Sequence, residues 1–215
     1  MRRSWAGGWV AGVFLAPAAA AMAQQASPAA DATQVVNAVW MEREIRFSYV
    51  GFTSYYSCDG LRDRVTWVLR EVGARPGFKV TARGCTRLNG PEMMPGVRIV
   101  AALPVAATPE ILAQLAADAS KRELAARAKG GSAVAAAAEA TAQFPARIRT
   151  VTFTSSRFGN ELQDGECELM EQLRDRVFGP LGVKVVEADI HCTPHQVNLA
   201  AVRMAVEVLE PLPPP

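Results

Sequence analysis

The chain contains two stretches of similar sequence, and each stretch carries one pair of cysteines. The segment 61–65 (Leu-Arg-Asp-Arg-Val) recurs letter for letter at 173–177. Shorter matches follow in the same order: Phe52-Thr53-Ser54 at 153–155, Cys58 at Cys167, Gly77-x-Lys79-Val80 at Gly182-x-Lys184-Val185, Cys85-Thr86 at Cys192-Thr193, and Val97-Arg98 at Val202-Arg203. An ordered run of matches indicates an internal duplication. The chain is therefore predicted to contain two copies of one structural unit.

Each copy has the pattern of a strand, a helix and two further strands. In the first copy, Ile45–Ser54 is rich in aromatic and β-branched residues, which is typical of a strand. An apolar stripe then predicts a helix over about 59–72, formed by Leu61, Val65, Val68 and Val72. Alternation over 78–84 and the apolar run 97–103 predict the other two strands. We predict an α+β fold of two tandem βαββ repeats, 41–105 and 147–210, with mixed sheets.

The second copy follows the same plan. Val151 and Phe153 alternate with threonines, and a stripe of Leu169, Leu173 and Val177 predicts a helix that stops at Gly179-Pro180. Strands are expected over 183–190 and around 202–208. The proline-rich tail 211–215 is expected not to pair in a sheet. The pattern leaves open whether the repeats form one sheet or two.

An alanine-rich segment, 106–146, joins the repeats, and 17 of its 41 residues are alanine. Thr108-Pro109-Glu110 is a typical helix start. Leu112, Leu115 and Leu124 lie on one side of that helix, and Gly130-Gly131 breaks it. We expect a structural helix followed by a mobile helical linker.

The N-terminus has the pattern of an export signal. Arg2 and Arg3 precede the apolar stretch Trp5–Ala20, and Ala21-Met22-Ala23 is a small-x-small cleavage site. We expect a Sec-type signal peptide over 1–23, a flexible segment over 24–40, and a periplasmic or secreted protein with no membrane span after cleavage. The chain has 23 basic and 21 acidic side chains, and the signal removes two arginines. This balance argues against nucleic-acid binding.

The repeat geometry predicts the disulfides. In a strand–helix–strand unit the second strand returns to the edge at which the first one ended. A helix over about 59–72 spans roughly 21 Å, and a strand over 78–84 spans roughly 23 Å in the opposite direction. Cys58 and Cys85 should therefore meet, as should Cys167 and Cys192. Bridges between the halves, such as Cys58 with Cys167, are the alternative.

Both histidines of the chain lie in one short segment, His191-Cys192-Thr193-Pro194-His195. Histidines four apart with a thiolate between them are suited to copper or zinc. The alternative is that Cys192 is oxidised and that the histidines lie on an exposed turn. We expect no cofactor, and a metal site at His191 and His195 stays the second hypothesis.

Tyr55 and Tyr56 lie at the turn between the first strand and the first helix, where α/β proteins often bind ligands. They are candidates for a ligand or partner surface, or for an unfamiliar catalytic site. The structural alternative is that Ser57 or Asp59 caps the helix while the tyrosines cover the disulfide.

Two groups of charged residues have structural and functional interpretations. The Arg-Asp-Arg triplets at 62–64 and 174–176 favour a solvated helix face, or pairing with the other repeat, over a phosphate site. A loop cluster could bind calcium weakly, but its order matches no EF-hand; it comprises Glu161, Asp164, Glu166 and Glu168.

The sequence contains no serine-histidine-acid constellation, phosphate loop or zinc-hydrolase motif. The leading hypothesis is therefore a non-catalytic module of the cell envelope that binds or scaffolds another envelope protein, with exposed sheet edges as partner surfaces. The alternatives are the copper or zinc protein using His191 and His195, and an enzyme with a site near Tyr55 and Tyr56.

The segment Phe52–Gly60, followed by Gly84-Cys85, resembles a signature of uncharacterised exported proteobacterial proteins. The resemblance covers mainly the first repeat, and it implies export but no activity and no catalytic residue. The order of elements is also similar to the small modules of secretins and related envelope proteins, and this similarity of topology implies no function.

Overall fold

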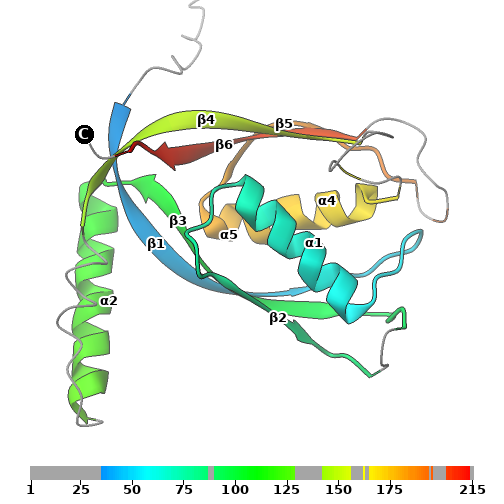
Figure 1. Cartoon of the computed structure of the whole chain (residues 1–215), viewed down its shortest axis with the longest axis horizontal. Coiled ribbons are helices and arrows are strands. Elements are labelled where there is room, and N and C mark those ends of the chain that lie inside the picture. Colours follow the sequence, from blue (N-terminus) through cyan, green and yellow to red (C-terminus); the bar gives the residue numbers. More distant parts are fainter. Residues whose placement is uncertain are drawn as a thin grey trace, which may run out of the picture. The chain divides into compact units, whose positions relative to one another are not determined.

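A single antiparallel sheet is the framework of the protein. The computed structural model describes residues 35–86, 90–128, 142–155, 162, 165–193, 195 and 202–213. In this part of the chain, six strands pair in the order β2-β3-β1-β4-β6-β5 (Figure 1). The strands are β1 (Val35–Ser48), β2 (Lys79–Arg83), β3 (Gly96–Ala106), β4 (Phe144–Thr154), β5 (Lys184–Asp189) and β6 (Arg203–Pro211). One sheet thus contains strands from both halves of the sequence.

The strand pairing differs from the mixed sheets that the sequence predicts. All five strand ladders are antiparallel. β1 and β2 do run in the same direction, but β3 lies between them and pairs with both. The helix that follows β1 therefore leads to β2, which lies two positions away in the sheet. β3 then runs antiparallel to both and lies between them. β5, β6 and β4 are arranged in the same way.

The two halves of the sheet meet at β1 and β4, which pair only over Val35–Ala38 and Phe144–Arg147. β1 therefore begins ten residues before the expected start at Ile45, inside the segment predicted to be flexible. Residues 38–44 pair with β3, and residues 35–38 pair with β4 of the other half. β1 also ends early, at Ser48, and residues 49–57 form an irregular turn.

One sequence match does not correspond to matching positions in the sheet. Phe52-Thr53-Ser54 lies in the turn after β1, whereas Phe153 and Thr154 lie within β4 and pair with β6. The register instead places Arg46 opposite Arg98, and Thr154 opposite Arg203. Since Arg98 and Arg203 are matched in sequence, Thr154 corresponds to Arg46 and not to Thr53.

The first helix agrees with its prediction. α1 spans Cys58–Glu71, and the hydroxyl of Ser57 caps it by accepting a hydrogen bond from the Gly60 N–H at 3.0 Å. The predicted stripe of Leu61, Val65 and Val68 is buried. The residue spacing of the stripe therefore places this face of α1 in the core.

The second helix continues beyond its predicted end at Gly179-Pro180. It comprises α4 (Cys167–Leu173), one π-helical turn, η1 (Arg174–Phe178), and α5 (Gly179–Leu181). Pro180 lacks an N–H, and the wider π turn directly before it relieves the hydrogen-bond pattern that proline would break. The helix ends at Gly182, whose φ of 80° is the left-handed conformation that glycine adopts most easily.

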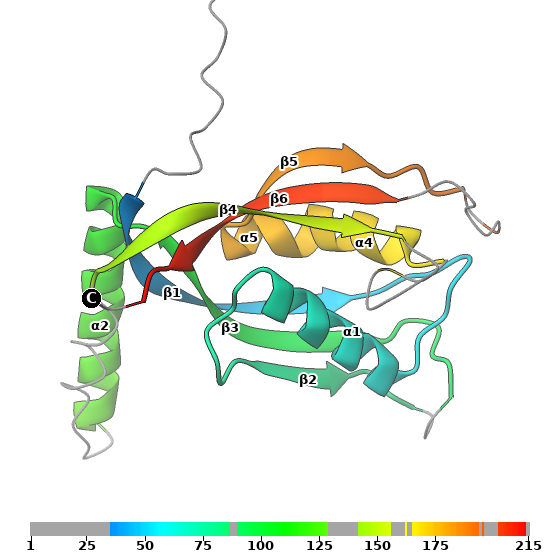
Figure 2. The same cartoon turned by 45° about the horizontal axis from the view of Figure 1, so that its top comes forward.

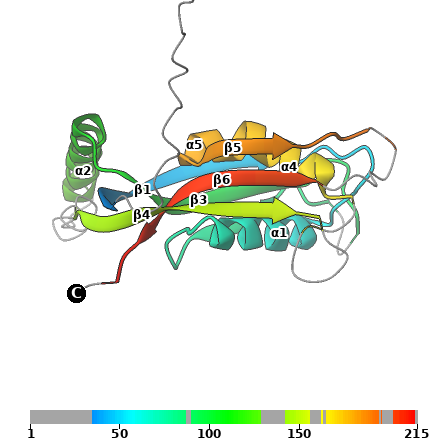
Figure 3. The ribbon, with the colours of Figure 1, turned by 90° about the horizontal axis from the view of Figure 1, so that it is seen from above.

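The two helices share one core with both halves of the sheet. Figures 1 and 2 show α1 and α4 between the half-sheet β2-β3-β1 and the half-sheet β4-β6-β5, and Figure 3 shows them side by side. Trp67 of α1 lies edge-on to Phe153 of β4, with ring centroids 5.7 Å apart. Arg149 of β4 donates to the Glu71 carbonyl at 2.7 Å. Each half therefore completes the core of the other, and residues 31–215 form one compact unit.

The alanine-rich segment contains the expected helix, α2 (Pro109–Ala128). Leu115 packs with Val39 and Met41 of β1, in a cluster separate from the main core. Leu124, which was expected to join this apolar side, is exposed. The predicted linker after Gly130 lies outside the described residues up to 141, and β4 begins at Phe144.

The C-terminal tail pairs further than the sequence predicts. Pro211 is the last residue of β6 and lies opposite Ala146. The Leu212 N–H donates to the Pro145 carbonyl at 2.9 Å. Pro211 is tolerated because a strand end requires no further N–H from it.

The disulfide prediction is confirmed. Cys58 is bonded to Cys85 and Cys167 to Cys192, with Cα atoms 6.1 Å and 5.7 Å apart. The predicted signal peptide lies outside the described residues. Among the described helices, none has the length and apolar character needed to cross a membrane.

Removing one bridge should destabilise the protein strongly. The Cys58→Ala/Cys85→Ala variant should lose about 3–4 kcal/mol of unfolding free energy, because the bridge closes a loop between residues 27 apart and so restricts the unfolded chain. Urea denaturation of both proteins measures the loss. The Cys167→Ala/Cys192→Ala variant is the matched control and should show a similar loss, since its separation is 25. A loss below about 1 kcal/mol for either would contradict this account.

Candidate functional site

The turn between β1 and α1, residues 49–57, brings the two halves of the protein into contact. The two candidate tyrosines of this turn point in different directions: Tyr55 is 57% exposed, and Tyr56 packs against the core. Tyr49, which no sequence motif indicated, is only 1% exposed and lies edge-on to Tyr56, with ring centroids 5.1 Å apart. The inner side of the turn is therefore a buried polar cluster.

Glu168 of α4 is the main acceptor in this cluster and is almost completely buried. Its Oε2 accepts from the N–H groups of Phe52 and Thr53 at 2.9 and 3.1 Å. Its Oε1 accepts from the Thr53 hydroxyl at 3.2 Å. The Tyr49 hydroxyl lies 3.3 Å from Oε2 and also 2.9 Å from the Ser54 carbonyl, so its one proton is shared. These donors match the acceptor capacity of a carboxylate.

The negative charge of Glu168 is compensated mainly by dipoles. No lysine or arginine of the described residues lies within ion-pair distance of its carboxylate. Glu168 occupies the first turn of α4, where the helix dipole favours an anion. Two backbone N–H groups of the turn face the same carboxylate oxygen. The carboxylate is thus held by a helix N-terminus on one side and by the 52–53 backbone on the other.

Glu166 forms the second polar contact between the halves. It is also buried, and it forms an ion pair with Arg64 of α1. The Tyr56 hydroxyl donates to its Oε1 at 3.1 Å. The Arg64 guanidinium lies over the Trp67 ring, 4.0 Å from its centroid. The predicted pairing of the first Arg-Asp-Arg triplet with the other half therefore exists at Arg64.

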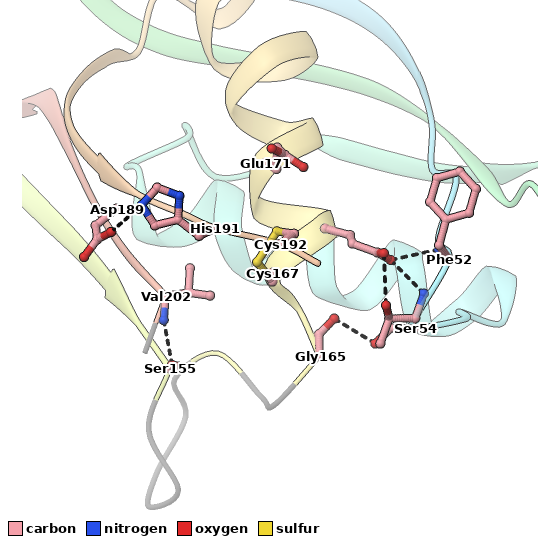
Figure 4. The surroundings of a disulfide bond; sticks show 12 residues. Phe52, Ser54, Ser155, Gly165, Cys167, Glu171, Asp189, His191, Cys192 and Val202 are labelled. Atoms are coloured by element: carbon pink, nitrogen blue, oxygen red, sulfur yellow. Dashed lines mark hydrogen bonds and ion pairs between the residues drawn. A yellow bond between two sulfur atoms is a disulfide. The ribbon is translucent and has the colours of Figure 1, made fainter. Parts of the chain in front are cut away.

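Two further contacts align the turn with the start of the second helix. Gln172 makes a reciprocal pair with Val50: the Val50 N–H donates to its Oε1 at 3.1 Å, and its Nε2 donates to the Val50 carbonyl at 2.7 Å. The Ser54 hydroxyl donates to the Gly165 carbonyl at 2.7 Å (Figure 4). Gly165 has a φ of +98°, and a Cβ there would lie 2.4 Å from the Ser54 Oγ, so only glycine fits. We call Glu166, Glu168 and Gln172, with their partners, the polar lock.

The cluster keeps both inner tyrosines protonated. Burial raises the pKa of Tyr49 above its ordinary value, and the charge of Glu168 raises it further. Burial likewise raises the pKa of Tyr56, with Glu166 as the second cause. A tyrosine that acts as a general base or nucleophile needs the opposite shift. The geometry of Tyr49 and Tyr56 therefore suits hydrogen-bond donation within the fold.

The two histidines have different partners, and the described contacts link only His195 to a residue of the polar lock. The His191 Nε2 lies 3.2 Å from the Asp189 Oδ1, and Figure 4 shows this pair on the opposite side of the Cys167–Cys192 disulfide from Ser54. His195 lies edge-on to Phe52, with centroids 5.7 Å apart. Cys192 is oxidised and cannot bind a metal as a thiolate. Within the described part of the chain, no three histidine, cysteine, aspartate or glutamate side chains are grouped in a way that could hold a metal.

The acidic cluster considered for calcium has a different role in its described members. Glu166 and Glu168 are buried and accept hydrogen bonds from the first half, so their oxygens face protein donors. Glu161 and Asp164 lie outside the described residues. One sequence feature could have indicated the lock: Glu166 and Glu168 replace Ser57 and Asp59 at the matched helix start.

Comparison with protein-family models, with curated proteins and with solved structures gives no match. Function is therefore inferred from the geometry of this chain.

Replacing Glu168 by its neutral isostere should destabilise the protein. The Glu168→Gln variant loses the charge and places an NH₂ group against hydrogen-bond donors, so we expect a loss of about 2–3 kcal/mol in urea denaturation. The matched control is Glu171→Gln on the same helix, whose side chain is 42% exposed. The control should change stability by less than about 0.5 kcal/mol. Equal effects of the two substitutions would contradict the lock.

The raised pKa values of Tyr49 and Tyr56 predict a loss of stability at high pH. The folded state binds these two protons more tightly than the unfolded state, so the stabilisation is complete below the unfolded tyrosine pKa of about 10 and is lost as the pH rises above it. In a Tyr55→Phe background only these two tyrosines remain, since the chain has 3 tyrosines. Absorbance of tyrosinate should appear at a higher pH in the folded protein than in urea. Coincident titration curves would refute the prediction.

Proposed function

We propose that this protein is a non-catalytic binding or scaffolding module of the cell envelope, exported and built from two duplicated halves. The observation that carries the proposal is the use of the buried polar groups. Glu166, Glu168, Tyr49 and Tyr56 all serve the contact between the halves. The chemistry that would make an active site is thus employed in holding the fold together, while the two edges of the sheet face outward.

The disulfides support the proposed location. Two bridges and no free cysteine in the described residues are compatible with an oxidising compartment such as the periplasm or the extracellular space. Together with the signal-like N-terminus, this favours export.

The strand order supports the proposed duplication. The half β2-β3-β1 is repeated as β5-β6-β4, and the two halves meet at the pairing of Asn37 with Pro145. If Arg46 and Thr154 are equivalent positions of the two halves, then Asn37 and Pro145 are equivalent as well. These two residues pair with each other, so the pair lies on the local two-fold axis that relates the halves. A pair formed by equivalent positions is expected when two copies associate symmetrically.

Affinity enrichment from an envelope extract tests the proposal. The mature chain, immobilised through its C-terminus, should enrich at least one partner from an envelope extract of the source organism. The same chain, reduced and alkylated, is the matched control and should lose that partner, because the disulfides hold the surface in shape. The proposal fails if the folded chain enriches nothing that the control does not. It also fails if untagged protein carries stoichiometric copper or zinc that a His191→Ala/His195→Ala variant loses.

A further inference from the structure

The two edges of the sheet differ in how open they are. β2 pairs with β3 along Lys79–Arg83 in an unbroken register. β5 pairs with β6 with a register shift between Val185 and Glu187, and Glu187 forms an ion pair with Arg203 across the ladder. Such irregularities hinder the addition of a further strand. β2 is therefore the edge at which the regular ladder can continue.

A groove follows the open edge. It has a volume of about 700 Å³ and lies between β2 and α1. One wall is the α1 face formed by Arg62, Thr66 and Arg70, which recur every four residues. The other wall carries the apolar side chains of Phe78 and Val80, both of which also contact the core. An extended chain beside β2 would direct alternate side chains into this groove.

The charge of the groove favours an acidic occupant. Its lining contains Arg62, Arg70 and Lys79, with Asp63 as the acidic residue. Arg62 is neutralised by Asp59 and Asp63 at 2.7 and 2.9 Å. Arg70 and Lys79 are exposed, and in the described part of the chain no carboxylate lies within ion-pair distance of either. Two uncompensated cations thus lie on the two sides of the groove.

We propose that the β2 edge binds an extended acidic segment of a partner protein, which adds to the sheet as a further strand. The outward N–H and C=O groups of β2 bind the backbone of the segment, the groove takes its apolar side chains, and Arg70 and Lys79 pair with its carboxylates. This inference deepens the proposed binding function by naming the surface and the kind of partner.

A labelled peptide tests the proposal on the intact mature protein. The peptide is about eight residues long, within the ordinary range of strand lengths. It carries valine or threonine at the positions that face the groove, and glutamate at the positions on the opposite face and at the end nearest Arg70. Fluorescence anisotropy should show saturable binding. A peptide with lysine in place of glutamate, and a peptide N-methylated at alternate residues in either phase, should each bind at least about tenfold more weakly. If N-methylation has no effect, the contact is electrostatic only and the strand-addition proposal is wrong.

Variants place the binding at β2. Arg70→Gln/Lys79→Gln should weaken peptide binding about tenfold, whereas Lys184→Gln, the sequence-matched position on β5, should leave it unchanged. Unfolding in urea should be close to that of the parent for both, since Arg70, Lys79 and Lys184 are exposed. Equal weakening by Lys184→Gln, or no peptide binding, would overturn the proposal.

Two outcomes separate this inference from the proposed function. If the envelope partner is enriched equally by the parent and by Arg70→Gln/Lys79→Gln, the binding function stands and the β2 site is wrong. If light scattering shows a dimer that the same double variant dissociates, the occupant of β2 is a second copy of the chain, and the acidic-partner proposal is wrong.

Discussion

The burial of the Glu168 carboxylate between the two halves is the constraint on which the rest of the fold depends. An ionised carboxylate without partners in this position would cost several kcal/mol. Its donors come from the turn after β1, more than a hundred residues away in sequence. The turn after β1 and the start of α4 must therefore come together when the protein folds. A structure with separated halves would leave both the carboxylate and the turn N–H groups without their partners.

The covalent and polar contacts have complementary roles. Each disulfide joins a helix start to the loop after the next strand within one half. The polar lock and the packing of Trp67 on Phe153 act between the halves. The second Arg-Asp-Arg triplet adds a weaker contact of this kind, since Arg176 donates to the Ser48 carbonyl at 3.3 Å. A disulfide therefore stabilises one half by restricting the unfolded chain, whereas the lock determines how the halves fit.

The features that could be predicted from the sequence depend on local periodicity or on the repeat. The Cys58–Cys85 bridge follows from the lengths of one helix and one strand, and α1 follows from its apolar spacing. The start of β1 at Val35 could not be predicted, because its first residues, 35–37, pair only with β4 near Pro145. The role of Glu168 was missed for a similar reason: no local pattern links it to Phe52 and Thr53. Pro211 was assigned to an unpaired tail because proline lacks an N–H, but this lack matters less at a strand end than inside a strand.

The two halves use a common framework for different purposes. At the matched helix starts, the first half has Ser57 and Asp59, which cap α1 and pair with Arg62, while the second half has Glu166 and Glu168, which reach across to the first. In the duplication that we infer, only the second copy has the glutamates of the polar lock. The similarity between the copies therefore does not predict the lock. The two edge strands also differ: β5 has a register shift, whereas β2 is regular. The turn at Tyr56 is used by the polar lock. The β2 edge, in contrast, combines unpaired backbone groups, an apolar groove and uncompensated cations.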